Sequence, residues 1–374
     1  MNILLVHDIK PVGEDQVTYS AVAYYRMQKP LEVLCRTHPG INYTTADTIA
    51  HIPDETLKQF DAVIFSRSFT EPEAVKDRLD RLNIMIGLDI DDYWHLPKEH
   101  VLADGYKKIG VPELIERCIT VSGFITCTTE ILADKIKPLN PEVYIIPNGI
   151  DPMEWQQNKV ESSRVRFGFT GGVTHIPDYA QVSKDVRRAL YDYQFRTKGQ
   201  IVLCGFNADA GKDSIQVGYE IMLTDKLKAL DKKYAKHLAT LSPLQVDNKP
   251  YRRIWHRDID QFHTTYDELD VVVAPLMDSE FNRCKSNIKM LEAGFKGCAA
   301  MVSGIAPYTP LATRENSFLL SEKNFFEWSR NIINNPTLLE DKTLALAESV
   351  KPYSLEVLSV KRKEIYESCI TVNV

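Results

Sequence analysis

The sequence predicts an α/β protein of two doubly wound domains, each with a parallel sheet between helices. Short apolar runs rich in branched residues alternate with longer amphipathic stretches, which is typical of strand–helix–strand units. The chain has 374 residues, more than one hydrophobic core usually organises, and the alternation restarts after Pro147. We expect one domain over residues 1–155 and another over 156–354, with a helix over 355–374 returning to the first. We expect the two domains to face each other across a cleft, where doubly wound folds bind ligands.

The first domain is predicted from short buried runs separated by amphipathic segments. The branched residues in these runs favour strands, and the longer segments between them have helical spacing. The predicted strands are Ile3–His7, Ala62–Ser66, Ile84–Asp89, Phe124–Thr126 and Val143–Ile146. The predicted helices are Ser20–Cys35, Glu73–Leu82, Val111–Val121 and Glu130–Ile136.

The second domain repeats this alternation. Its predicted strands are Arg166–Thr170, Gln200–Gly205, Val271–Pro275 and Ala299–Val302. Its predicted helices lie near Tyr179–Tyr193, Ser286–Phe295 and Asn324–Asn334. A last helix, Leu355–Val374, follows the break at Pro352.

Charge is distributed unevenly along the chain, whose formal net charge is -6. Residues 1–150 carry 15 Lys and Arg against 22 Asp and Glu, so the first domain is acidic. Residues 226–257 carry nine Lys and Arg and two acids, with Tyr251 and Trp255 among them. Two interpretations of this basic segment stay open, a solvated helix face followed by a loop or a docking face for phosphates.

Cysteine usage and hydropathy favour a cytoplasmic protein. The seven cysteines are scattered and form no C-x-x-C pair of the kind that clamps zinc or shuttles electrons. No apolar run approaches the ~20 residues that span a bilayer. The opening residues MNILLVHDIK have the pattern of a strand rather than of a signal peptide. We therefore expect a cytoplasmic location and no membrane span.

The segment Val271–Tyr308 carries the strongest indication of a ligand site. A strand ends, a polar loop follows, and a helix is predicted to begin near Lys285 and Ser286. This spacing puts Lys285, Lys289 and Glu292 on one side of the helix. A helix start with a lysine beside it suits a diphosphate, and a glutamate two turns later suits the vicinal hydroxyls of a ribose. The alternative is an amphipathic helix with solvent-facing lysines.

This segment resembles the nucleotide-sugar site of GT-B fold glycosyltransferases, especially the retaining glycosyltransferase family 4, which has an E-x7-E helix after the strand. Glu292 stands where the second glutamate would be, and Cys284 replaces the first. From Phe281 to Glu292 the chain reads F-N-x-x-K-S-x-x-K-x-x-E, a variant associated with outlying bacterial and phage members. The first glutamate's contact with the donor sugar would then pass to Glu280 or Asn282.

A second segment, VYIIPNGID, resembles the turn that closes the first domain in this family. A buried strand is stopped by Pro147, and Asn148 and Gly149 form the pair best suited to a tight turn. In the first predicted helix, Arg26 would still reach the cleft, whereas its aromatic neighbours are more typical of a core.

A third segment, RFGFTGGVTHIPD, resembles the diphosphate-facing loop at the first strand–helix turn of the second domain. Gly171 and Gly172 would let backbone amides approach an anionic group without side-chain hindrance. The resemblance adds His175 to this loop. His175 and Asp178 are equally interpretable as a helix cap and its neighbour.

A fourth segment, IGLDIDDYWHLP, contains the pair Asp89-x-Asp91. We reject a metal site here, because a transferase with two Rossmann-like domains stabilises the leaving diphosphate with backbone dipoles and cations. The family places the loop after this strand near the donor sugar and the acceptor, which makes Asp91, Asp92 and His95 candidates. The alternative is an Asx-type cap with Trp94 packed beneath it.

The resemblance implies an enzyme that moves a hexose or pentose from a nucleoside diphosphate sugar, with UDP-sugars favoured, to an acceptor hydroxyl with retention. No cofactor or metal is expected beyond this donor substrate. The implied catalytic residues are Asp91, Asp92, His95 and Lys285. The implied donor-binding residues are Gly171, Gly172, His175, Arg253, Asn282, Lys285, Ser286, Lys289 and Glu292.

The acceptor stays open between a glycan, lipid or small molecule, hydroxymethylated cytosine in phage DNA, and a protein. For DNA, phosphates would be met by Lys232, Lys233, Arg252, Arg253 and Arg257 of the basic segment. Two rival functions also remain. One is a nucleotide-sugar 2-epimerase of the same fold, which would convert donor alone, and the other is a non-catalytic nucleotide-sugar-binding subunit.

Overall fold

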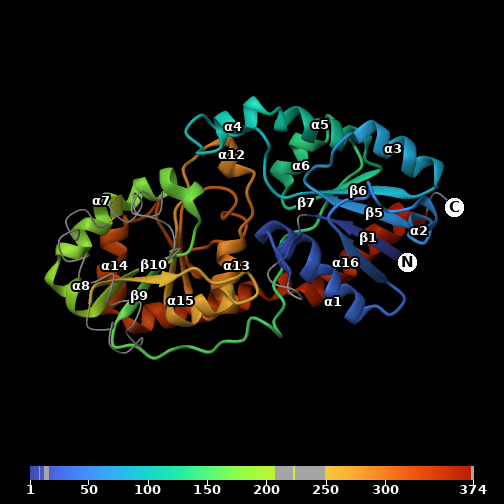
Figure 1. Cartoon of the computed structure of the whole chain (residues 1–374). Coiled ribbons are helices and arrows are strands. Elements are labelled where there is room, and N and C mark those ends of the chain that lie inside the picture. The colour runs from blue at the N-terminus through green and yellow to red at the C-terminus, as the bar shows by residue number, and fades with distance from the viewer. Residues whose placement is uncertain (8, 12–16, 207–221, 224–248, 372–374) are drawn as a thin grey trace. The chain divides into compact units, whose positions relative to one another are not determined.

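The structure is a computed structural model, and it describes the chain except residues 8, 12–16, 207–221, 224–248 and 372–374. The chain folds into two compact units (Figure 1). The first unit comprises Met1–Pro152, Ser279–Ser286 and Pro352–Val374. The second comprises Met153–Asp278 and Asn287–Lys351. Among the described residues, no helix is both long and apolar enough to cross a bilayer.

The first unit has a six-stranded parallel sheet in the order β4-β1-β5-β6-β7-β8. The strands are β1 (Asn2–Val6), β4 (Asn42–Ala46), β5 (Ala62–Ser66), β6 (Met85–Ile90), β7 (Phe124–Cys127) and β8 (Val143–Ile145). A small antiparallel pair, β2 (Ile9–Pro11) and β3 (Val17–Tyr19), follows β1. The strand order reverses between β1 and β5, so that point is the topological switch point of the unit.

Two helix layers cover this sheet (Figure 1). The helices are η1 (Ala23–Gln28), α1 (Lys29–Thr37), α2 (Asp54–Leu57), α3 (Pro72–Arg81), α4 (Ala103–Lys108), α5 (Val111–Val121), α6 (Glu130–Ile136), α12 (Glu280–Arg283) and α16 (Leu355–Thr371). On β1, Ile3 and Leu5 share a core with α1 and α16, while Leu4 and Val6 share another with α3, α5 and α6. This alternation is the period of two that a strand buried on both faces requires.

The last helix, α16, packs on the first unit as the sequence predicts. The ring of Tyr366 lies 5.9 Å from that of Phe124 in the sheet, and Thr37 of α1 donates to Ser359 over 3.2 Å. At Gly149 a Cβ would come within 2.7 Å of Leu355, so the turn after β8 needs glycine because α16 approaches it closely.

The second unit has a parallel sheet in the order β11-β10-β9-β12-β13-β14. The strands are β9 (Val165–Phe169), β10 (Gly199–Phe206), β11 (Tyr251–Trp255), β12 (Val271–Ala274), β13 (Ala299–Val302) and β14 (Ser317–Leu319). In chain order this is 3-2-1-4-5-6, the Rossmann order, with its switch point between β9 and β12. The carboxyl ends of these two strands are therefore where the fold places a ligand.

Helices again cover both faces. They are η2 (Val173–His175), α7 (Ile176–Tyr191), α8 (Tyr193–Lys198), η4 (Phe262–Glu268), α13 (Ile288–Phe295), α14 (Phe325–Asn334) and α15 (Pro336–Ser349), and η5 (Lys351–Tyr353) leads to α16. Phe167 and Phe169 of β9 share a core with α7, α8 and α14. On β12 and β13, α13 and α15 supply the other layer.

Apart from the short pair β2 and β3, three described strands were not predicted from the sequence, and all three lie at the edges of the six-stranded sheets. These are β4, β11 and β14. The residues of β4, NYTTA, carry little apolar surface, and β11 contains two arginines inside what was interpreted as a helix face and loop. An edge strand has one neighbour and more solvent, so its sequence need not be a buried apolar run.

Candidate functional site

The loop after β9 lies at the switch point of the second unit. Gly171 donates its backbone N–H to the hydroxyl of Tyr179 over 2.9 Å, and a Cβ at Gly171 would meet that hydroxyl at 2.5 Å. Gly171 is therefore required by packing against α7, which corrects the expectation that its amide is presented to an anion. A Cβ at Gly172 would meet nothing within 4 Å, so packing does not require glycine at this exposed position.

Asp178 ties this loop to the one after β12. Its side chain is buried, with Oδ2 2.9 Å from Nδ1 of His175 and Oδ1 accepting the backbone N–H of Met277 over 2.8 Å. His175 is the N-cap residue of α7 but makes no capping bond with its side chain. The pair thus joins the loops on the two sides of the switch point, a connection that the sequence did not indicate.

Glu292 is the buried acid of this site, with 1% of the residue exposed. Its Oε2 accepts from the hydroxyl of Tyr266 and lies 2.8 Å from Nζ of Lys289. The hydroxyl of Tyr266 is also 3.2 Å from Oγ1 of Thr170, the residue after β9. Burial, and then the charge of Glu292, raise the pKa of Tyr266 well above 10, so the phenol keeps its proton and donates. The result is a fixed carboxylate near the carboxyl end of β9.

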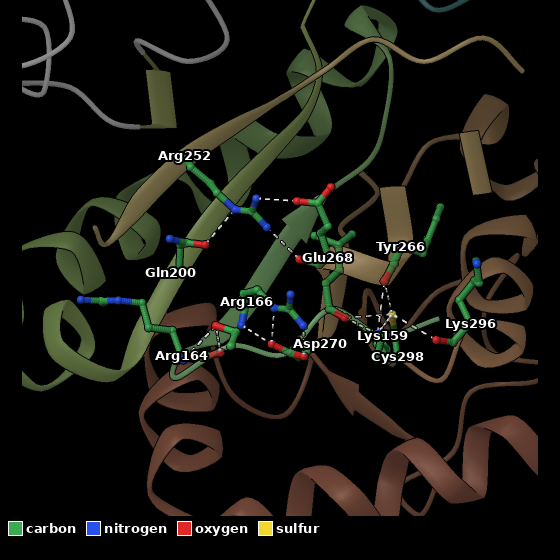
Figure 2. A network of polar contacts seen from close by, with 12 residues as sticks. Lys159, Arg164, Arg166, Gln200, Arg252, Tyr266, Glu268, Asp270, Lys296 and Cys298 are labelled. Carbon is green, nitrogen blue, oxygen red and sulfur yellow. Dashed lines mark hydrogen bonds and ion pairs between the residues drawn. The ribbon is translucent and has the colours of Figure 1, made fainter. Parts of the chain in front are cut away.

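Tyr266 is held in place by the ion pairs of η4 and its surroundings (Figure 2). Asp267 pairs with Lys296 at 2.7 Å, and Glu268 pairs with Arg252 at 2.6 Å. Nζ of Lys159 lies 3.2 Å from the carbonyl oxygen of Tyr266 and 2.8 Å from Sγ of Cys298. Charged bonds of this kind are short and directional, so η4 holds the phenol against Glu292. Neither Tyr266 nor Thr170 was found from the sequence.

The basic segment does not form a phosphate-binding surface at Arg252. This side chain is 5% exposed, and its guanidinium donates to Glu268 and, over 2.9 Å, to Gln200 (Figure 2). Arg253 follows on β11 and is half-buried, and Arg257 pairs with Glu268 at 2.6 Å. The expected DNA contact of Arg252 is therefore wrong. Lys232 and Lys233 lie outside the described residues.

In the first unit, Asp89 has a structural role. Its two carboxylate oxygens accept from Nε and Nη2 of Arg26, each over 2.8 Å, and Oδ2 also accepts from Thr126 over 2.6 Å. Arg26 also donates to the carbonyl of Ile146 and to Asn148 of the turn after β8. Both charges are 1% exposed, so Arg26 is a core residue and the first aspartate of the D-x-D pair is already engaged. Within the described ranges, no group of three His, Cys, Asp or Glu side chains could hold a metal.

Asp91 and Asp92 follow β6 and have different surroundings. Oδ1 of Asp91 is buried, accepts no hydrogen bond from the described residues, and lies 3.5 Å from Nε of Arg67. Burial raises the pKa of Asp91 to about 6, although the charge of Arg67 opposes the shift. Asp92 pairs with Lys285 at 3.2 Å. His95 is half-exposed, and its Nε2 lies 2.9 Å from Oε1 of Glu116. Within the described residues, no hydrogen bond or ion pair links His95 to another candidate residue.

The segment Ser279–Ser286 contacts the first unit rather than continuing α13. A short helix, α12, ends at Arg283, and α13 begins only at Ile288. Lys285 therefore precedes the helix that carries Lys289 and Glu292, which corrects the expected helix start. Ser286 accepts from the side chain of Asn148 over 2.8 Å.

Cys284, which stands in place of the first glutamate of the E-x7-E pattern, is a core residue. Cys284 is fully buried in the core of the first unit, where burial raises the pKa of its thiol to about 11. Glu280 is an exposed partner of Lys135, and Asn282 is buried. The candidate residues thus fall into two groups. The first unit has Asp91, Asp92, His95, Asn282, Lys285 and Ser286, and the second has Gly171, Gly172, His175, Arg253, Lys289 and Glu292.

The same fold occurs in solved structures. No protein-family model and no curated protein sequence matches the chain. Its structure is similar to sucrose-phosphate synthase from Thermosynechococcus elongatus, with a TM-score of 0.66, 11% identity and 99% of each chain covered. It is similar to HepE from Anabaena in complex with UDP and glucose, with a TM-score of 0.60, 12% identity, and 98% of this chain and 100% of HepE covered.

A glycosyltransferase from Rickettsia africae ESF-5 is also similar, with a TM-score of 0.59, 12% identity, and 99% of this chain and 98% of that chain covered. The chain spans 54% of the length of TarM, a further similar structure. These similarities, with the two six-stranded parallel sheets, confirm the predicted fold class, an α/β protein of two Rossmann-like units of the GT-B kind.

Proposed function

We propose that the chain is a glycosyltransferase that moves a sugar from a UDP-sugar to an acceptor hydroxyl with retention at the anomeric carbon. The observation that carries this proposal is the buried carboxylate of Glu292, held by Tyr266 and Lys289 beside the carboxyl end of β9. A carboxylate fixed at the switch point of a Rossmann-ordered sheet is suited to the vicinal hydroxyls of a ribose. The UDP complex of HepE, a protein of the same fold, supports a uridine donor.

In this proposal the second unit binds the donor. Glu292 accepts hydrogen bonds from the ribose hydroxyls, and we assign the diphosphate to the open side of Gly172 and to Lys289. Negative charge grows on the diphosphate as the glycosidic bond breaks, and a cation already in place stabilises that charge at no cost of reorganisation.

The first unit supplies the acceptor side. Asp91 and Asp92, with Lys285, are the polar groups that orient the acceptor hydroxyl, and the role of Asp91 as a hydrogen-bond acceptor grows above about pH 6 as it ionises. His95 is the least supported candidate because it is bonded to Glu116 near the surface. We place the reaction in the cytoplasm, with a hexose or pentose as the transferred sugar. A glycan, lipid or small molecule is the favoured acceptor, and hydroxymethylated cytosine in phage DNA is the alternative.

A thermal-shift panel of nucleotides and nucleotide sugars tests the donor class first. A ligand at 100 times its Kd stabilises the folded state by about 2.7 kcal/mol, which at about 2–4 °C per kcal/mol raises the Tm by roughly 5–11 °C. We expect this shift with UDP and a UDP-sugar and not with ADP or GDP. A shift with purine nucleotides alone would contradict the proposed donor.

NMR of the products then tests the reaction. We expect slow release of UDP from the donor alone and an α-linked product when an acceptor is added. Conversion of the donor to its 2-epimer without any acceptor would instead show the epimerase. Donor binding with neither hydrolysis nor transfer across the acceptor panel would show a non-catalytic binding subunit.

A further inference from the structure

A basic and aromatic surface lies on three helices of the second unit and includes none of the residues assigned to the donor. We call it the α7–α8 face. It is formed by the exposed side chains of Lys184, Arg188, Tyr191, Tyr193, Arg196, Lys198 and Arg330. Six of these seven residues come from a stretch of 15 positions, Lys184–Lys198.

Contacts among the three helices bring several of these side chains together. Lys184 and Arg188 are one turn apart on α7, and Tyr191 is almost one turn further along the same side. Arg188 and Arg330 lie 4.1 and 5.7 Å from the ring of Phe326, so α7 and α14 meet there. Arg330 also donates to Gln194 of α8 over 3.4 Å. Figure 1 shows α7, α8 and α14 beside one another.

Within the described residues, the cations of the α7–α8 face have no carboxylate partner. Some exposed cations on or beside other helices pair with carboxylates, as in Lys58 with Glu55, Lys76 with Asp80 and Arg117 with Glu73. In the part of the chain that the structure describes, none of the five cations of this face lies within 4.0 Å of a carboxylate. A chain of net charge -6 therefore gathers an excess of positive charge at one place, which attracts a polyanion.

Three acids lie near this face and offset part of its charge, and two of them also cap helices. Asp192 accepts from the backbone N–H of Phe195 and caps α8. Glu327 forms a capping box with Asn324 at the start of α14. The third acid, Asp185, is half-buried, and burial raises its pKa, so it offsets less positive charge than an exposed aspartate would.

Two exposed tyrosines indicate which kind of polyanion fits this face. Tyr191 and Tyr193 are 63% and 83% exposed and lie on either side of the α7–α8 turn. Aromatic rings among cations are the arrangement that stacks on the unpaired bases of a single strand while its phosphates are neutralised. A membrane-binding face needs aliphatic, Phe or Trp side chains instead, and the described exposed residues of that kind lie on other elements.

We propose that the α7–α8 face binds single-stranded nucleic acid. Arg188, Arg196 and Lys198 neutralise phosphates, and Tyr191 and Tyr193 stack on bases. Binding here needs neither a donor nor sugar transfer, so the proposal stands or falls separately from the proposed function.

Fluorescence anisotropy with a short fluorescein-labelled single strand of DNA tests this surface at several NaCl concentrations. We expect salt-dependent binding by the wild type. The double variant Arg188→Glu/Arg196→Glu should bind more weakly and lower the salt slope by about 1.4, because each phosphate contact to a single strand contributes about 0.7. The control is Lys108→Glu/Lys361→Glu, which makes the same change in net charge at exposed sites of the first unit. Equal loss in both variants, or no binding by the wild type, overturns the proposal.

Tyr193→Ala separates base stacking from general attraction to polyanions. We expect it to weaken binding of the DNA strand roughly 5- to 150-fold while leaving heparin binding unchanged. An equal loss for DNA and heparin overturns the stacking role. If vesicles containing phosphatidylglycerol bind this face and the DNA strand does not, the surface is a membrane site and the proposal is wrong. Unchanged Tm values and unchanged circular dichroism spectra show that the variants keep their fold.

Discussion

Replacing Asp89 by asparagine is expected to destabilise the first unit, although the change removes a single charge and keeps the side-chain shape. Asp89 accepts two bonds from Arg26 and one from Thr126, and both members of the ion pair are 1% exposed. An amide carries no charge to balance the buried guanidinium. Arg26 keeps its bonds to Ile146 and Asn148, so it cannot leave for solvent without breaking the turn after β8.

The magnitude follows from the cost of an uncompensated buried charge. Removing one partner of a buried pair costs about 3–5 kcal/mol. For a unit of this size each kcal/mol lowers the Tm by about 2–4 °C, so the expected loss is roughly 6–20 °C. The double variant Arg26→Met/Asp89→Asn should lose less than the two single losses added together, because it removes both charges.

Differential scanning calorimetry at neutral pH measures these losses. The matched control is Asp80→Asn, since the carboxylate of Asp80 pairs with Lys76 at the surface, where such a pair contributes about 0–1 kcal/mol. A Tm for Asp89→Asn as close to wild type as that of the control would refute the structural role of Asp89. It would also reopen the interpretation of Asp89-x-Asp91 as a metal site.

Three further predictions follow from the same surroundings. Activity should survive EDTA, because Asp89 is already bonded to Arg26, and loss of turnover restored by Mg²⁺ or Mn²⁺ would contradict this. The pKa of Asp91 is about 6 in the folded chain and about 4 in the unfolded chain, so between these pH values the unfolded chain has lost a proton that the folded chain keeps. The free energy of unfolding should therefore fall as pH rises from about 4 to about 6. Asp91→Asn should abolish that fall, as thermal unfolding across this pH window would measure, and the same fall in the variant would assign it to another group. Cys284→Glu should unfold the first unit at lower temperature than Cys284→Ser, because it buries a carboxylate among apolar side chains, and equal Tm values would disagree.

The central strands and most helices could be predicted because both faces of each sheet are covered. Such strands must be continuous apolar runs. The helices that cover them must have apolar residues spaced three or four positions apart, so that one face is buried. The three missed strands of the six-stranded sheets lie at edges, where this requirement is relaxed. The helix start predicted near Lys285 was wrong because the segment before α13 contributes Cys284 to another core, a tertiary demand that local spacing does not record.

Glu292 could be singled out because an acid in an apolar helix is a conflict visible in the sequence alone. Its partners could not be found in this way. Tyr266 is 26 positions away and precedes the strand β12, and its neighbours in η4 form ion pairs with other elements. The aspartates at and after the end of β6 were equally visible in the sequence. Only the structure distinguishes Asp89, which is bonded to Arg26 63 positions away, from Asp91.

The central claim, that Glu292 marks a nucleotide site in the second unit, is tested most directly by calorimetric titration of UDP into the wild type and Glu292→Gln. The wild type should bind UDP. The variant should bind it roughly 10- to 150-fold more weakly, since a hydrogen bond to a charged group contributes about 1.5–3 kcal/mol. Glu340→Gln, an exposed change on α15, should leave the affinity unchanged. A folded Glu292→Gln variant that binds UDP as tightly as the wild type would contradict the account.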